Sequence, residues 1–133
     1  MTLTLAEANS IVHAAITKAR ELNITVSVAV CDNLGYPIAL NRMDGVLGEA
    51  TRFSLGKAVV SSNTGLPSGE VRGIVDHPPG AYLVALGIPA LRVQGGLPIF
   101  RNGKIEGACG VAGASSHDQE EECARAGIVS IQR

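Results

Sequence analysis

The sequence is poor in aromatic residues, so few large side chains are available to fill its core or to line a ligand site. Only 3% of the 133 residues are aromatic and tryptophan is absent, whereas 46% are hydrophobic. The core must therefore be built from small aliphatic side chains that pack closely. A core with so few large side chains is consistent with additional burial between subunits.

Charge runs of one sign and long apolar runs are also missing. The chain carries 11 basic and 12 acidic residues, a formal net charge of −1, and they are spread along the sequence. This distribution argues against a nucleic-acid-binding surface. The apolar stretches fall short of the roughly 20 residues that a membrane helix needs, and residues 1–20 lack the charge order of a signal peptide. We therefore expect a cytoplasmic protein with no membrane partner.

Cysteine is scarce, and its spacing argues against disulfides and structural metal sites. Cys31, Cys109 and Cys123 are odd in number and far apart, unlike a disulfide framework or a zinc knuckle. Cys31 and Cys109 lie in apolar runs typical of strands, so both are predicted to be buried free thiols. No histidine has a second ligand at the helical spacing typical of metal sites. The sequence predicts no metal ion.

The chain does contain clear helix and strand signals over the length of one domain. We predict a single domain over residues 1–133, large enough to bury roughly 65–70% of its unfolded surface. Periodicity and capping signals predict four helices. They span about 5–22, 49–62, a short stretch over 68–75, and a last stretch from Ser115 or Ser116 towards 131. The first begins at the capping box Thr4-Leu5-Ala6-Glu7. Alternation and turn signals predict strands over 25–31, 36–42, 97–100 and 105–112, with a type I′ turn at Asn102-Gly103. A further short element could form over 81–86, and residues 91–94 lead to Gly95-Gly96. Because strands follow one another without alternating helices, we predict an α+β fold with an antiparallel sheet of about five strands flanked by helices.

Several of these segments resemble, in order and spacing, the signatures of the GlcG/HbpS-like family. The matching runs are Val28–Gly35, Arg42–Gly45, Lys57-Ala58, Gln94–Ile99, Asn102–Gly113 and Ala124–Gly127. The resemblance spans nearly the whole chain and implies a profilin-like sheet in a homo-oligomer, with a small-molecule pocket near a subunit interface. Family members are linked to haem, to corrinoids, as in the C-terminal domain of the PduO corrinoid proteins, or to glycolate-pathway operons. The resemblance therefore implies haem or a corrinoid as candidate cofactors.

Three charged residues are candidates for a ligand pocket. Arg42 and Asp44 bracket the end of a predicted strand, and Lys57 lies between Gly56 and Ala58 in a helix rich in small residues. Arg42 could bind a carboxylate through two parallel hydrogen bonds, while Asp44 or Lys57 could move a proton. A partly desolvated lysine loses basicity and can act as a base or form an imine. The alternatives are a salt bridge among these residues and a lysine whose ammonium reaches water.

The three histidines differ in their settings. His77 lies in a loop stiffened by Pro78 and Pro79, where a presented imidazole suits acid–base catalysis. His13 flanks the apolar stripe of the first helix and is either a half-exposed packing residue, which the pattern favours, or an axial ligand to haem iron. His117 opens the last helix, so it is either exposed or a neutral imidazole that points at a site.

Glycines and an acidic run complete the set of candidates. Gly95 and Gly96 could bring backbone amides against an anionic or planar ligand, or could only permit close packing. Glu120 begins the acidic run that continues to Glu122. The resemblance to the GlcG/HbpS-like family implies that Glu120 takes the place of the acidic residue that members usually have before the final helix. This run is either solvated or turns one carboxylate inward to a ligand site.

Three functions fit these residues. The first is a binding protein for haem or a corrinoid, which the family resemblance implies. The second is a cofactor-independent lyase, isomerase or hydrolase acting on a small carboxylated or carbonyl metabolite, with Arg42 as anchor and Lys57, His77 or Asp44 moving protons. The third is an accessory subunit that acts through its surface. The sequence leaves open whether the protein is an enzyme.

Overall fold

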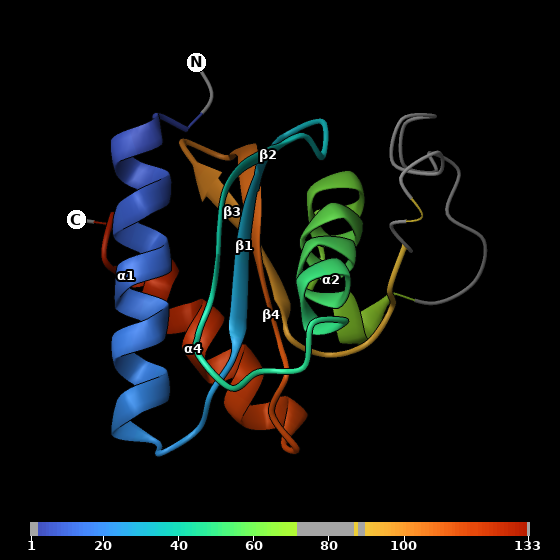
Figure 1. The fold of residues 1–133 in the computed structure, drawn as a ribbon. Coiled ribbons are helices and arrows are strands. Elements are labelled where there is room, and N and C mark those ends of the chain that lie inside the picture. Colours follow the sequence, from blue (N-terminus) through green and yellow to red (C-terminus); the bar gives the residue numbers. More distant parts are fainter. Residues whose placement is uncertain (1–2, 72–86, 88–89, 133) are drawn as a thin grey trace.

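A computed structural model shows an antiparallel sheet between two layers of helices (Figure 1). The structure describes residues 3–71, 87 and 90–132; His77, and the part of the expected short helix beyond Val71, lie outside them. The elements in chain order are α1 (Leu5–Glu21), β1 (Ser27–Asp32), β2 (Pro37–Arg42), α2 (Ala50–Thr64), the 3₁₀ turn η1 (Ser68–Glu70), β3 (Gly96–Arg101), β4 (Lys104–Ala112) and α4 (His117–Val129). The predicted α+β class is confirmed.

The sheet has four strands within the described residues, in the order β2-β1-β4-β3, and every neighbouring pair is antiparallel. About five strands were predicted; the further short element expected over 81–86 lies outside the described residues, and residues 91–94 form no strand. The Leu91 amide donates to the Gly56 carbonyl of α2, and the Val93 carbonyl accepts from the Ser68 hydroxyl. This segment therefore lies along α2, because helix and turn groups take the hydrogen bonds that a sheet edge would need.

The local turn and capping signals are confirmed. The Thr4 hydroxyl accepts from the Glu7 amide at 3.1 Å, and the Glu7 carboxylate accepts from the Thr4 amide at 2.9 Å, which completes the capping box. Asn102 and Gly103 have φ angles of 53° and 76°, as a type I′ turn requires. Ser116 is the N-cap of α4.

The helices divide the core into two layers. In Figure 1, α1 and α4 cover one face of the sheet and α2 covers the other. Val28 and Val30 of β1 face α1 and α4, whereas Ala29 and Cys31 face α2. None of the described helices is both long and apolar enough to cross a membrane.

The cysteines give a first prediction, on thiol reactivity. All three thiols are buried and free, and burial raises the pKa of Cys31 to about 12 and that of Cys123 to about 11. Because only the thiolate reacts, we expect Ellman's reagent at pH 8 to label none of them in the native protein and all three in urea. Rapid labelling of one thiol without denaturant would contradict the buried positions.

Candidate functional site

A buried ion pair joins α2 to α4. Lys57 and Glu120 are 2% and 1% exposed, and Lys57 Nζ donates to Glu120 Oε1 at 2.9 Å and to the Val111 carbonyl at 2.9 Å. The structure therefore brings together two residues that the sequence analysis proposed separately. The ammonium group of Lys57 does not reach water but ends on a carboxylate and a carbonyl.

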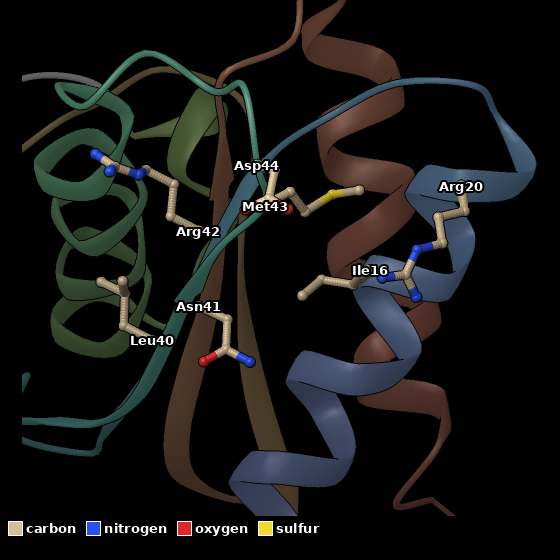
Figure 2. A pocket seen from close by; sticks show the side chains of 7 residues that line it. All are labelled: Ile16, Arg20, Leu40, Asn41, Arg42, Met43 and Asp44. Atoms are coloured by element: carbon tan, nitrogen blue, oxygen red, sulfur yellow. The ribbon is translucent and has the colours of Figure 1, made fainter.

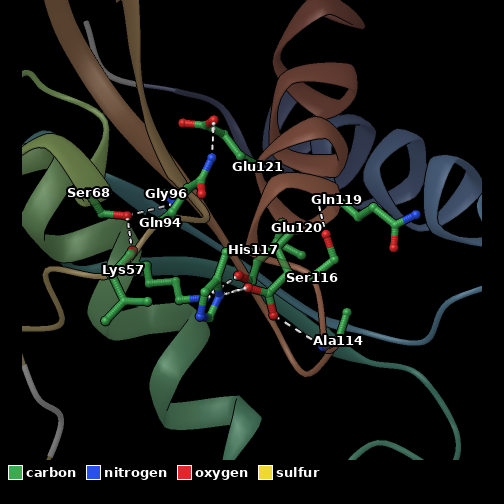
Figure 3. Close-up of polar contacts among 12 residues, drawn as sticks. Lys57, Ser68, Gln94, Gly96, Ala114, Ser116, His117, Gln119, Glu120 and Glu121 are labelled. Atoms are coloured by element: carbon green, nitrogen blue, oxygen red, sulfur yellow. Dashed lines mark hydrogen bonds and ion pairs between the residues drawn. The ribbon is translucent and has the colours of Figure 1, made fainter.

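Glu120 connects this pair to an imidazole (Figure 3). His117 Nδ1 lies 2.8 Å from the same Oε1 atom, and Oε2 accepts from the Ala114 amide at 3.1 Å. His117 and Glu120 are three residues apart on α4 and so share one helix face. The His117 side chain is 55% exposed, so the contacts run from a buried amine through a carboxylate to a group in contact with solvent.

Gly95 and Gly96 close one side of Lys57. A Cβ atom at Gly95 would lie 2.8 Å from Lys57 Nζ, and one at Gly96 would lie 2.5 Å from the Lys57 carbonyl oxygen. The Gly96 amide donates to the Ser68 hydroxyl at 2.8 Å. These contacts match the close-packing alternative; a direct ligand contact for either glycine stays a prediction.

Burial changes the acid–base properties of Lys57. Desolvation lowers the pKa of Lys57 below its usual range, and the hydrogen bond and charge of Glu120 act in the opposite direction. The net lowering means that more of this amine is unprotonated at neutral pH than in an exposed lysine. Lys57 is thus better suited to proton transfer or nucleophilic attack than an exposed lysine is.

The three groups lie at one end of a cavity of about 410 Å³, named here the Lys57 pocket. Its polar end consists of Lys57, His117 and Glu120. Its walls are largely apolar and include Leu47, Ala50, Phe53, Leu91, Val93 and Ala112. A concave, mostly apolar surface with a few converging polar groups is the usual form of a small-molecule site.

Arg42 and Asp44 line a different hollow, of about 530 Å³, between β2 and α1 (Figure 2). Arg20, from α1, lines it as well. Neither Arg42 nor Asp44 forms an ion pair in the part of the chain that the structure describes, and Lys57 pairs with Glu120 instead of with them. The structure therefore does not bring Arg42 or Asp44 to Lys57, and their ligand roles stay predictions.

Some members of the site were not singled out from the sequence. The Val111 carbonyl and the Ala114 amide are backbone groups, and no residue type signals them. His117 was weighed as a site residue or an exposed one, and its spacing of three from Glu120 was the available signal that both share a helix face. His13, by contrast, is exposed on α1.

Comparison with known proteins agrees with this fold. The family described as "Haem degrading protein HbpS-like" matches residues 3–129. An uncharacterised 15.0 kDa protein from the dhaT-dhaS intergenic region of Citrobacter freundii is 34% identical over 118 residues, covering 86% of this chain and 82% of that protein. GlcG of Escherichia coli strain K12 is 33% identical over 108 residues, covering 79% and 77%. The crystal structure of a Streptomyces reticuli HbpS double mutant has a TM-score of 0.84 at 30% identity, covering 100% of this chain and 89% of that chain. The chain belongs to the HbpS-like family.

Proposed function

We propose that this domain binds a small ligand in the Lys57 pocket and that the ligand is haem. The observation that carries the proposal is the His117–Glu120 contact of 2.8 Å at the polar end of an apolar pocket. The pocket volume of about 410 Å³ falls in the range typical of ligand sites. The description of the matching family as haem degrading favours haem among planar ligands.

The residues present fit a haem group. A histidine that ligates a metal commonly donates its other ring N–H to a carboxylate, which fixes the tautomer and the ring orientation. Glu120 contacts His117 Nδ1 in this way, so His117 would be the residue that holds the iron through its other ring nitrogen. Phe53, Leu91 and Val93 would contact the macrocycle. When bound, haem would supply an iron centre for redox chemistry.

A haem titration tests this proposal. We expect a saturable shift of the Soret absorbance when haemin is added to the purified protein. In His117→Ala we expect the affinity for haemin to fall about tenfold or more, because the histidine that would hold the iron is lost. His13→Ala is the matched control and should bind as the wild type does, because His13 lies on α1 and does not line the pocket. A parallel titration with a corrinoid tests the other tetrapyrrole. Equal haem affinity in His117→Ala and wild type would contradict the assignment.

The buried amine favours a second candidate, a cofactor-independent enzyme that uses acid–base chemistry. Lys57 has a lowered pKa and touches a carboxylate that also touches an imidazole. Asp44 lines another hollow, so we assign the proton-transfer roles to Lys57, Glu120 and His117.

A further inference from the structure

We infer that the Lys57 pocket is a carbonyl site in which Lys57 Nζ forms a Schiff base with a small, uncharged aldehyde. This inference deepens the second candidate function and rests on it; it does not depend on haem binding.

The position of the amine is the first argument. Lys57 lines the pocket, and two acceptors, Glu120 Oε1 and the Val111 carbonyl, fix its Nζ atom at 2.9 Å each. Gly95 packs directly against the same end of the side chain. The nucleophile is therefore held in place before a ligand enters, which lowers the entropic cost of attack.

Proton transfer is the second argument. Imine formation requires a group that takes a proton from the amine and one that returns a proton to the departing oxygen. Lys57 Nζ and His117 Nδ1 both lie within 2.9 Å of Glu120 Oε1. Because the His117 side chain is 55% exposed, a continuous path of hydrogen bonds leads from Lys57 through this carboxylate to solvent.

The chemistry of the walls identifies the ligand class. Among the described residues that line the pocket, Lys57 is the only lysine or arginine, and its charge is already balanced by Glu120. Arg42, the anchor expected for a carboxylated metabolite, lines the other hollow. Around Lys57 the described walls thus offer an apolar surface and no free cation, which suits a neutral aldehyde with a short hydrocarbon chain better than a small metabolite whose carboxylate or phosphate would be enclosed beside Glu120.

The step balances without any further reactant. The Lys57 ammonium passes a proton to Glu120, and the free amine attacks the carbonyl carbon, so that a C–N bond forms and the C=O π pair moves to oxygen. The oxygen takes the proton from Glu120, and a second proton moves from nitrogen to that oxygen through Glu120 and His117. The C–O bond then breaks, and water leaves as the nitrogen lone pair forms the C=N bond. The ammonium and the aldehyde become a protonated imine and water, and Glu120 remains as the counter-ion.

The chain carries its own controls, because it contains only three lysines. Lys18 is partly exposed and lies near Glu21 and Glu122, and Lys104 is exposed at the β3–β4 turn. Burial lowers the pKa of Lys57, and of the three lysines only Lys57 lines the pocket.

Reductive trapping tests the inference. Haem-free protein is incubated with butanal and sodium cyanoborohydride at pH 7, and the modified lysine is located by peptide mass spectrometry. We expect most of the adduct at Lys57 and little at Lys104, because of these two lysines only Lys57 lines the pocket. In His117→Gln, which removes an exposed side chain, we expect slower trapping at Lys57 and unchanged trapping at Lys104.

Two outcomes would overturn the inference of a Schiff base at Lys57. One is labelling of Lys18 and Lys104 with Lys57 unmodified in folded protein. The other is turnover of aldehydes in the pocket with no adduct at Lys57, which would keep the acid–base candidate and remove the Schiff base. Trapping is measured by mass spectrometry on haem-free protein. A negative result therefore concerns the Schiff base alone, whereas a negative Soret titration concerns haem binding.

Discussion

Replacing Glu120 with glutamine is expected to lower the free energy of unfolding by about 3–5 kcal/mol, because it leaves the buried Lys57 ammonium without its counter-charge. Lys57 and Glu120 are 2% and 1% exposed, so water cannot take over the role of the carboxylate without a structural change. The loss is to be measured by urea unfolding at pH 7, followed by circular dichroism.

Two further variants show whether the cost comes from burial of the pair. Glu122→Gln is the matched control, because Glu122 lies on the same helix, is 47% exposed and is 3.8 Å from Lys18; we expect a change below about 0.5 kcal/mol. The double variant Lys57→Met with Glu120→Leu should recover much of the stability, since a buried ion pair is often replaceable by apolar side chains. A loss below about 1 kcal/mol in Glu120→Gln would mean that Lys57 sheds its proton at little cost.

The parts of the fold that were predictable from the sequence depend on local signals. The capping box at Thr4–Glu7 and the Asn102-Gly103 turn each involve residues close in sequence, so their geometry follows from residue type. The segment 91–94 resembles a strand locally, but strand formation depends on context. Here the Leu91 amide bonds to α2 instead, a competition that local pattern does not contain.

The site is harder to predict because its members are distant in sequence. Lys57 and Glu120 are separated by 63 positions. Each has an ordinary local explanation, a lysine that reaches water and an acidic residue in a solvated first helical turn. The sequence likewise left open whether Arg42 and Lys57 converge: Arg42 pairs with Ser27 in the sheet register, at the edge strand, whereas Lys57 lies in the middle of α2. Only the packing of α2 on the sheet decides which polar groups meet.

That packing can be tested at Gly110, near the C-terminal end of β4. A Cβ atom there would lie 2.0 Å from the Ser54 carbonyl oxygen and 2.7 Å from the Ala58 amide nitrogen. Both are backbone atoms of α2, so Gly110→Ala cannot be relieved by side-chain rotation, and α2 must move away from the sheet. We expect a loss of about 3 kcal/mol in the free energy of unfolding, measured by urea denaturation.

The same substitution should also weaken the site, because Lys57 is the residue before Ala58 on the displaced helix. A shift of α2 would lengthen the 2.9 Å contact between Lys57 Nζ and Glu120 Oε1, and we expect slower butanal trapping at Lys57. Gly48→Ala is the control, since its Cβ would meet only the end of the Arg42 side chain, at 3.0 Å, and both stability and trapping should be unchanged. Wild-type stability and trapping in Gly110→Ala would show that close contact between α2 and β4 is not what holds Lys57 against Glu120.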